Sequence, residues 1–231
     1  MALPEIPLSG GEMTASVVRI GDRVHRSPAA NAAFTQAVLQ YLEAQAFPFS
    51  PRYLGQDAKG REVLSFLPGD VPRAIPLNFP QMKACIRILR SFHDLMAKSP
   101  LRGEMETVCH HDFAPWNVIV DQKTITGLID FDTALPGARV EDVGYFLWTF
   151  LDLGDPYLDD QEQLERVEEL LSFYGPLDRK ALIPALQQRQ NDILQYRKDL
   201  AISAPSPEQR AAAQQRCEEI KMSMQWVATH L

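Results

Sequence analysis

Two short acidic segments in the middle of the chain hold the residues best suited to catalysis. The first reads HHDFAPWN over residues 110–117, and the second reads IDFD over residues 129–132. Phosphoryl transfer requires an oriented hydroxyl nucleophile and divalent metal to neutralise charge on the nucleotide phosphates. Asp112 is predicted to accept the proton of the acceptor hydroxyl. Asn117 and Asp130 are predicted to hold Mg²⁺ through oxygen ligands.

The spacing of these residues is compatible with one common site. Asn117 lies five residues after Asp112, far enough for a loop to present the carboxylate and then return the amide toward a metal. Two short apolar strands around the polar turn 121–124 would bring Asp130 back to the same ion. Either segment alone is weak evidence, since Ile-Asp-Phe-Asp can also be an ordinary strand end with a capping acid.

The first third of the chain predicts a small sheet with one helix. Gly21 and Asp22 have the turn chemistry of a β-hairpin. Apolar residues recur at helical spacing from 29 to 46, and Pro48 ends that pattern. Four segments have the composition of strands: 16–20, 23–26, 53–54 and 62–66.

The rest of the chain predicts mainly helices. An amphipathic pattern runs from about 79 to 97, and helical patterns resume after Asp142. Three breaks divide these later helices: 154–156, 175–176 and 204–205. The Pro-Gly pair at 68–69 interrupts the chain between its two parts. We therefore expect a nucleotide-binding lobe at 1–68 and a catalytic and substrate-binding lobe at 69–231.

Composition excludes several partners and compartments. The formal net charge is −7 and no block of Lys and Arg is present, which argues against nucleic acid and mildly favours a cationic substrate. The start lacks a secretory signal, and no run of about 18 apolar residues occurs, so we expect a cytoplasmic protein without a membrane partner. Cys85, Cys109 and Cys217 are read as reduced thiols.

The two acidic segments resemble those of the aminoglycoside phosphotransferase and choline kinase-like family. In that family the catalytic loop reads His-x-Asp-x-x-x-x-Asn and the metal segment reads Ile-Asp-Phe/Trp-Asp/Glu. The resemblance implies an α+β, protein-kinase-like two-lobed fold, with an antiparallel sheet and one helix in the small amino lobe and a mainly helical carboxyl lobe. It also implies that Mg²⁺ and ATP or GTP bind between the lobes, and that the γ-phosphoryl group passes to a hydroxyl of a small molecule.

Further nucleotide-binding positions follow from this resemblance. Gly10 and Gly11 look like the turn that covers the nucleotide, although they could also form a simple flexible turn. Ser65 and Leu67 lie in a segment that looks like the interlobe hinge. Arg26 stands where the family has a phosphate-binding lysine, so it is the predicted substitute, with a solvated strand charge as the other interpretation.

The helix that carries the lysine's glutamate partner in the family has no acid at the expected place. Thr35 and Gln36 stand there, and Glu43 lies about two turns further on. We therefore expect that ion pair to be absent. Asp132, the second acid of the metal segment, could secure local structure or contact ligand.

Two other classes of protein remain open. A nucleotide-binding regulatory pseudokinase would explain the missing lysine and glutamate. A metal-dependent hydrolase built on His110, His111 and Asp112 would bind a transition metal, whereas we expect His110 to brace the loop through backbone hydrogen bonds. The acceptor could be an amine-bearing compound such as an aminoglycoside or choline, or homoserine, a sugar or a macrolide. The sequence does not determine the oligomeric state.

Overall fold

The computed structural model describes residues 3–8, 17–72 and 76–231. The chain forms two compact units, Met1–Gly137 and Ala138–Leu231. Gly10 and Gly11, the predicted nucleotide-covering turn, lie outside the described residues. The lobe boundary predicted between residues 68 and 69 stays a prediction.

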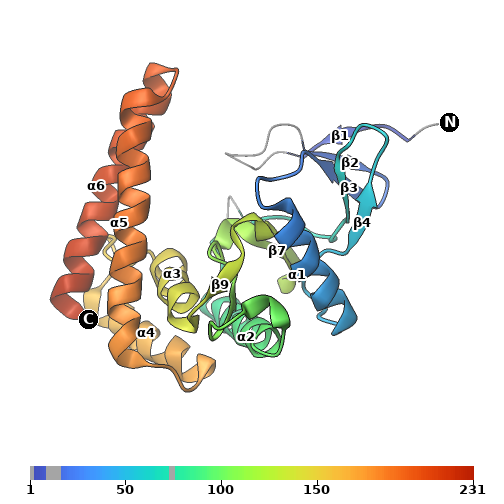
Figure 1. Ribbon diagram of the computed structural model, residues 1–231. Coiled ribbons are helices and arrows are strands. Elements are labelled where there is room, and N and C mark those ends of the chain that lie inside the picture. The colour runs from blue at the N-terminus through green and yellow to red at the C-terminus, as the bar shows by residue number, and fades with distance from the viewer. Residues whose placement is uncertain (1–2, 9–16, 73–75) are drawn as a thin grey trace. The chain divides into compact units, whose positions relative to one another are not determined.

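A five-stranded antiparallel sheet forms the start of the first unit, in the order β1-β2-β3-β5-β4 (Figure 1). Its strands are β1 (Ile6–Pro7), β2 (Val18–Ile20), β3 (Arg23–Arg26), β4 (Tyr53–Gln56) and β5 (Glu62–Ser65). Ile20 pairs with Arg23, so Gly21 and Asp22 are the two turn residues. Gly21 has a φ of 63°, which a tight hairpin turn requires and glycine adopts without strain. The predicted hairpin is confirmed.

Among the described residues, helix α1 (Ala32–Ala44) is the one helix between the strands of this sheet. Its buried face consists of Thr35, Val38, Leu39 and Leu42, which recur at the three- and four-residue spacing of an amphipathic helix. The opposite face is exposed or half-buried. The helix predicted over 29–46 is therefore present, with its ends inside the predicted bounds.

The remainder of the first unit consists of a long helix and two short strand pairs. Helix α2 (Phe79–Met96) is followed by strand β6 (Thr107–Cys109), which pairs with β9 (Leu135–Gly137), while β7 (Val118–Asp121) pairs with β8 (Thr124–Leu128). Three 3-10 turns complete it: η1 (Pro100–Arg102), η2 (Pro115–Asn117) and η3 (Phe131–Thr133). Both acidic segments thus lie between β6 and β9, and the β7–β8 hairpin separates them.

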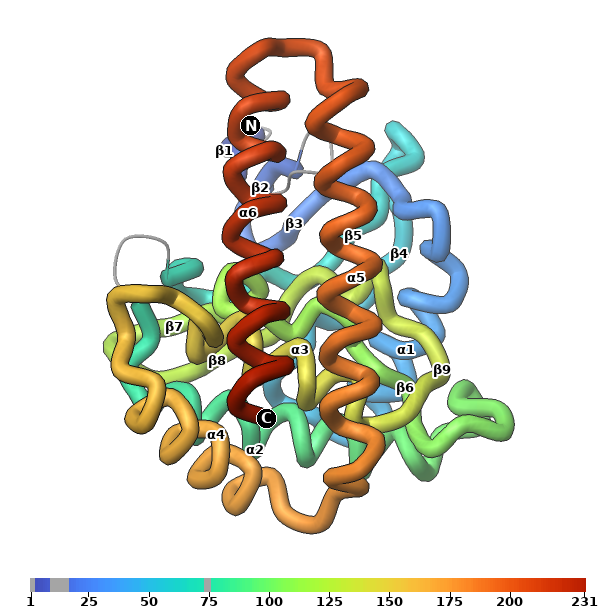
Figure 2. The backbone as a smooth tube through the Cα atoms, turned by 90° about the vertical axis from the view of Figure 1, so that its left-hand side faces the viewer, coloured from blue at the N-terminus to red at the C-terminus, as the bar shows by residue number. Residues whose placement is uncertain are grey.

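The second unit consists of helices α3 (Arg139–Leu151), α4 (Asp160–Tyr174), α5 (Arg179–Ser203) and α6 (Pro207–His230). Figures 1 and 2 show α5 and α6 running side by side as a long helical hairpin. The predicted breaks separate these helices. Gly144 allows α3 to approach α5, because a Cβ at that position would lie 3.0 Å from the Cβ of Leu186. No helix among the described residues combines the length and the apolar character that crossing a membrane would require.

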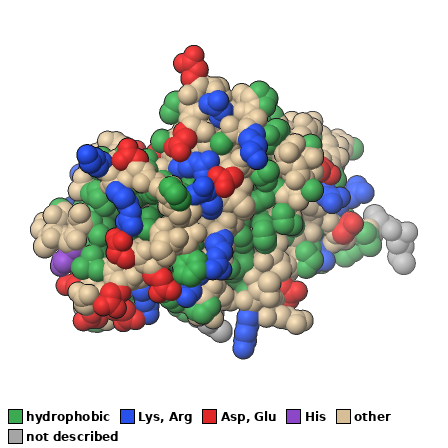
Figure 3. Space-filling view, turned by 90° about the horizontal axis from the view of Figure 1, so that it is seen from below, with side chains coloured by type: hydrophobic (Ala, Val, Ile, Leu, Met, Phe, Trp, Pro, Cys, Tyr) green, Lys and Arg blue, Asp and Glu red, His purple; other side chains and the backbone are tan. Residues whose placement is uncertain are grey.

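Acidic residues of the second unit perform local structural tasks. Asp159 accepts a hydrogen bond from the Glu162 amide at the start of α4, and Asp178 caps α5 in the same way. Asp160 accepts a bond of 2.6 Å from the Trp226 indole, which ties α4 to α6. On the face of the molecule shown in Figure 3, acidic and basic side chains are interspersed with apolar ones.

Candidate active site

The His110 imidazole joins the two acidic segments. Its side chain is fully buried against the Phe131 ring, with 4.6 Å between ring centroids. Nδ1 accepts a hydrogen bond from the Asp112 amide at 3.3 Å, and Nε2 donates to the Ile129 carbonyl at 3.2 Å. These bonds require a neutral ring protonated at Nε2. The expected bracing role is confirmed, and His110 is not available as a metal ligand of a hydrolase because both of its ring nitrogens are engaged within the protein.

Asn117 and Asp112 are hydrogen-bonded to each other. The Asn117 Nδ2 donates to Oδ2 of Asp112 at 2.7 Å and to the Asp112 backbone carbonyl at 2.9 Å. The backbone carbonyl of Asn117 in turn accepts from the Ile129 amide at 2.9 Å. Because the nitrogen of the side-chain amide faces Asp112, the oxygen is the atom that Asn117 offers to a cation.

Asp130 follows strand β8 in an unusual backbone conformation. Its φ of 65° lies in the left-handed region, which costs energy for a residue with a Cβ and is frequent at functional sites. The side chain is 40% exposed. Burial, followed by the nearby charges of Asp132 and Asp112, raises the pKa of Asp130 to about 6, and Arg26 opposes that shift. The structure therefore brings Asp112, Asn117 and Asp130 to one place.

Arg26 lies beside the metal segment. Its Nη1 and Nη2 donate to the two carboxylate oxygens of Asp132 at 2.9 and 2.5 Å, and Nη1 is 3.9 Å from Oδ1 of Asp130. Burial lowers the pKa of Arg26, but the hydrogen bonds to Asp132 and the charges of Asp132, Glu62 and Asp130 raise it by more than burial lowers it. The net pKa is therefore raised, and the side chain stays charged. The interpretation as a solvated strand charge is wrong, since the residue is buried.

Glu62 is the acidic residue that the sequence reasoning missed. Its Oε2 lies 3.2 Å from Nη2 of Arg26, so the ion pair that was expected to be absent is formed by a neighbouring strand. Helix α1 carries no acid at this point, as expected, but Gln36 donates from Nε2 to Oε1 of Glu62 at 2.9 Å. A signal existed in the sequence: Glu62 is a charged residue at the start of an otherwise apolar strand.

The segment after β5 connects the sheet to the β7–β8 hairpin. Ser65 is tied to Arg52 by two bonds, one from the Ser65 amide at 2.9 Å and one from the Arg52 amide to Oγ at 2.8 Å. The Leu67 side chain packs over Gly127, where an added Cβ would lie 2.5 Å from Cδ1. Asp70 then pairs with Val120 of β7. Ser65 and Leu67 thus begin the connection that the resemblance identifies as the hinge.

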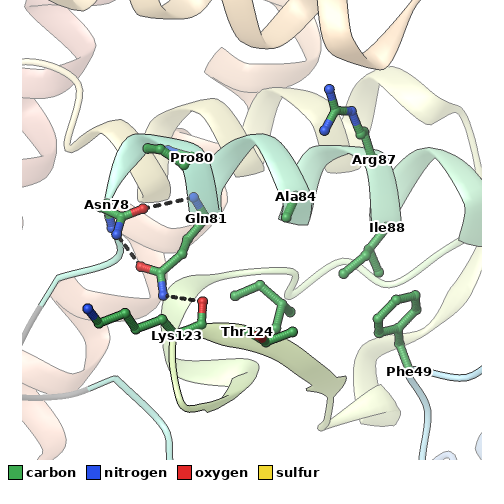
Figure 4. A pocket seen from close by; sticks show the side chains of 10 residues that line it. Phe49, Asn78, Pro80, Gln81, Ala84, Arg87, Ile88, Lys123 and Thr124 are labelled. Carbon is green, nitrogen blue, oxygen red and sulfur yellow. Dashed lines mark hydrogen bonds between the residues drawn. The ribbon is translucent and has the colours of Figure 1, made fainter.

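A pocket of about 560 Å³ lies elsewhere in this unit, between α2 and the β7–β8 turn (Figure 4). Its polar groups connect structural elements. Asn78 and Gln81 form a reciprocal capping box, and Gln81 donates to the Lys123 carbonyl at 3.0 Å. None of the predicted site residues lines this pocket, and we assign it no role in catalysis.

The charges around the site suit a divalent cation. Burial, and then the charges of Asp132 and Asp112, raise the pKa of Asp130, while Arg26 is shared between Asp132 and Glu62. Three carboxylates thus lie near one another beside a single arginine, an arrangement that a bound cation would stabilise. Carboxylate and amide oxygens are also the donors that Mg²⁺ prefers. The residues present therefore fit this metal.

The architecture is that of the protein-kinase-like fold. A solved microcompartment-associated aminopropanol kinase superposes with a TM-score of 0.70 at 15% identity, covering 98% of this chain and 91% of that one. Spectinomycin phosphotransferase in complex with ADP and spectinomycin superposes with a TM-score of 0.61 at 13% identity, covering 96% and 88%. The expected α+β fold, with an antiparallel amino-terminal sheet and a mainly helical remainder, is confirmed.

Sequence similarity identifies the family within this fold. Residues 96–177, which include both acidic segments, match the phosphotransferase enzyme family. The chain is also 31% identical to the trifolitoxin immunity protein of Rhizobium leguminosarum bv. trifolii, over 76% of each chain. The chain belongs to the phosphotransferase enzyme family.

Proposed function

We propose that the protein transfers the γ-phosphoryl group of ATP to a hydroxyl of a small molecule. The observation that carries this proposal is the hydrogen bond of 2.7 Å from Asn117 to the Asp112 carboxylate, beside Asp130, whose pKa is raised by burial and by the charges of Asp132 and Asp112. This arrangement supports a base and two metal ligands at one point. ATP is the proposed donor because spectinomycin phosphotransferase was solved with ADP, and no comparison favours GTP.

Asp112 is the proposed base. Its carboxylate orients the acceptor hydroxyl and takes its proton while the hydroxyl oxygen bonds to the γ-phosphorus. The bond from that phosphorus to the β–γ bridging oxygen breaks, and ADP leaves. Asn117 and Asp130 would hold Mg²⁺, which neutralises charge on the phosphates. The hydrogen bond from Asn117 keeps the base and the metal ligands in a fixed relation.

The nucleotide positions remain part of the proposal. Arg26 would contact the phosphates, since it is charged, buried and within 3.9 Å of Asp130. Ser65 and Leu67 would border the nucleotide at the hinge, and the glycine pair 10–11 would cover it. The lobes 1–68 and 69–231 follow from these roles. A reaction that consumes ATP is consistent with the cytoplasm.

For the acceptor we propose an amine-bearing alcohol, such as an aminoglycoside or a choline-like compound. The net charge of −7 favours a cationic partner, and the aminopropanol kinase and spectinomycin phosphotransferase share this fold. A panel of spectinomycin, aminopropanol, choline, ethanolamine, homoserine and a macrolide would test it. If the protein phosphorylates a compound of the panel that has no amine, and none of the amine-bearing compounds, the proposed acceptor class is wrong but the proposed phosphoryl transfer stands.

Thermal unfolding tests nucleotide and metal binding directly. Wild type and Asp130→Asn are melted with ATP, GTP or neither, with and without Mg²⁺. Ligands that bind only the folded state raise the melting temperature. We expect a rise with Mg-ATP that Asp130→Asn loses and that Asp121→Asn retains, because Asp121 is an exposed acid of the adjacent hairpin. A wild-type protein that no nucleotide stabilises would contradict the proposal.

The identity to the trifolitoxin immunity protein supports a second candidate function, immunity to a toxin. Immunity could depend on phosphorylation or on binding alone, and the latter matches the regulatory alternative without transferase activity. Asp112→Asn separates them in a strain whose toxin resistance depends on this chain. Lost resistance supports phosphorylation, and retained resistance supports binding. The pseudokinase alternative was suggested by a missing lysine and a missing acidic partner. The second of these reasons is weakened because Glu62 pairs with Arg26.

A further inference from the structure

We propose that Glu62 is the positioning residue for Arg26, so that a carboxylate on a neighbouring strand holds the phosphate-binding cation and Gln36 links the pair to helix α1. This inference rests on the proposed function. In the family that the sequence resembles, one acidic residue of the helix orients the phosphate-binding lysine. We assign the orientation of Arg26 to Glu62 and Gln36 together.

The sheet itself sets the distance between Glu62 and Arg26. The two residues are direct partners in the antiparallel β3–β5 register, where Cβ atoms lie about 4.5–5.5 Å apart. The side chains meet at 3.2 Å, and both residues are buried. Since strand pairing fixes the register, this carboxylate faces Arg26 whether or not the helix moves.

The second carboxylate oxygen of Glu62 connects the pair to α1. Gln36 donates to it at 2.9 Å, and Gln36 stands near the place where the family has its acid. A neutral amide is the suitable residue there, because a second carboxylate next to the buried Glu62 would add an unpaired negative charge. The helix therefore contributes a donor, and the strand contributes the charge.

Two buried atoms of the Arg26–Glu62 pair are unsatisfied within the described part of the chain. Nε of Arg26 and Oε2 of Glu62 have no hydrogen-bond partner, although Oε2 is in ion-pair contact with Nη2. The terminal nitrogens of Arg26 are meanwhile bonded to Asp132. Arg26 thus retains a donor and Glu62 an acceptor. Such a pair can persist when a phosphate replaces Asp132 as the partner of the guanidinium.

Four matched variants test the inference, each exchanging an amide and a carboxylate of nearly equal size: Glu62→Gln, Gln36→Glu, their double variant and the control Glu43→Gln. Glu43 lies on the same helix and is paired with Arg52 at the surface. Dissociation constants for Mg-ATP and for adenosine are measured by calorimetry, and chemical denaturation without nucleotide gives the stability of each variant. Adenosine lacks the phosphates, so its binding reports any general damage to the site.

Glu62→Gln is expected to weaken Mg-ATP binding about 10- to 100-fold, by analogy with the loss of a residue that orients a metal ligand, and to leave adenosine binding unchanged. The double variant restores one carboxylate beside one amide and is expected to recover most of that loss, while Glu43→Gln behaves as wild type. Equal losses for both ligands, or no loss, would overturn the role of Glu62. A double variant no better than Glu62→Gln would overturn the link to α1. Wild type that binds no Mg-ATP would instead refute the proposed function itself.

Discussion

The Asn117 amide donates to both the carboxylate and the backbone carbonyl of Asp112, at 2.7 and 2.9 Å. One side chain thereby fixes the position of the proposed base and, through its oxygen, offers a ligand to the proposed metal. The contact also closes the loop that His110 braces from its buried side. In the proposed function, orientation of the base and binding of the metal would thus depend on the same loop, residues 112–117.

Asp112→Asn should reduce turnover by about 10² to 10⁴ because the variant cannot accept the acceptor's proton. The amide keeps the size of the carboxylate and an oxygen that accepts from Asn117, so Mg-ATP affinity should change by less than about threefold. Steady-state kinetics with the first acceptor found, together with calorimetry, measure both quantities. Unchanged turnover would remove Asp112 from the role of base.

Asp130→Asn should stabilise the metal-free protein. The folded-state pKa of about 6 exceeds the ordinary value of 3.8, so ionisation of Asp130 opposes folding. Stability of the wild type should therefore fall as pH rises from about 4 to about 6 and stay lower above that range. Two pKa units correspond to about 3 kcal/mol, which solvent screening of a 40% exposed side chain reduces to about 1 kcal/mol.

Chemical denaturation at several pH values, in the presence of a chelator, measures this effect. The curve of Asp130→Asn should lie above that of the wild type at pH 7 and converge with it near pH 4. Parallel curves across the whole range would show that the Asp130 carboxylate is not under electrostatic strain. Asp121→Asn is the control, since it removes an exposed carboxylate of the same hairpin region.

Gly69→Ala should destabilise the protein more than Gly55→Ala. Both glycines have positive φ, 121° at Gly69 and 108° at Gly55, so the backbone strain of alanine is similar. A Cβ at Gly69 would lie 2.6 Å from the Val120 carbonyl oxygen, whereas none of the described atoms lies within 4 Å at Gly55. The difference in the free energy of unfolding should be about 1–3 kcal/mol. Equal losses of unfolding free energy in the two variants would refute the close approach of the segment around Gly69 to strand β7.

The three cysteines should react with a thiol reagent only after unfolding. Cys85, Cys109 and Cys217 are buried and form no disulfide, and burial raises the pKa of the Cys85 thiol far above its usual range. Since the thiolate is the reactive form, labelling of the native protein should be slow. Mass spectrometry should then find three labels in denaturant. Rapid labelling of Cys85 without denaturant would contradict its placement in the core.

Local patterns in the sequence were sufficient for most elements. Apolar periodicity predicted α1 and α2, turn chemistry predicted the β2–β3 hairpin, and Pro and Gly breaks predicted the ends of the later helices. Strands β6 and β9 were missed because each has three residues and pairs only with a segment far away in the chain. Strands of that length carry no periodicity, so only their pairing defines them.

The sequence by itself determined the family, most of the helices and strands, and the candidate residues Asp112, Asn117 and Asp130, because these are encoded in short contiguous patterns. Only the tertiary structure decided which groups surround Arg26. Glu62 faces it because β3 and β5 pair in one register, and Asp132 reaches it from a segment more than 100 residues away. Partners of this kind depend on the alignment of distant strands and loops in space, which no local pattern specifies.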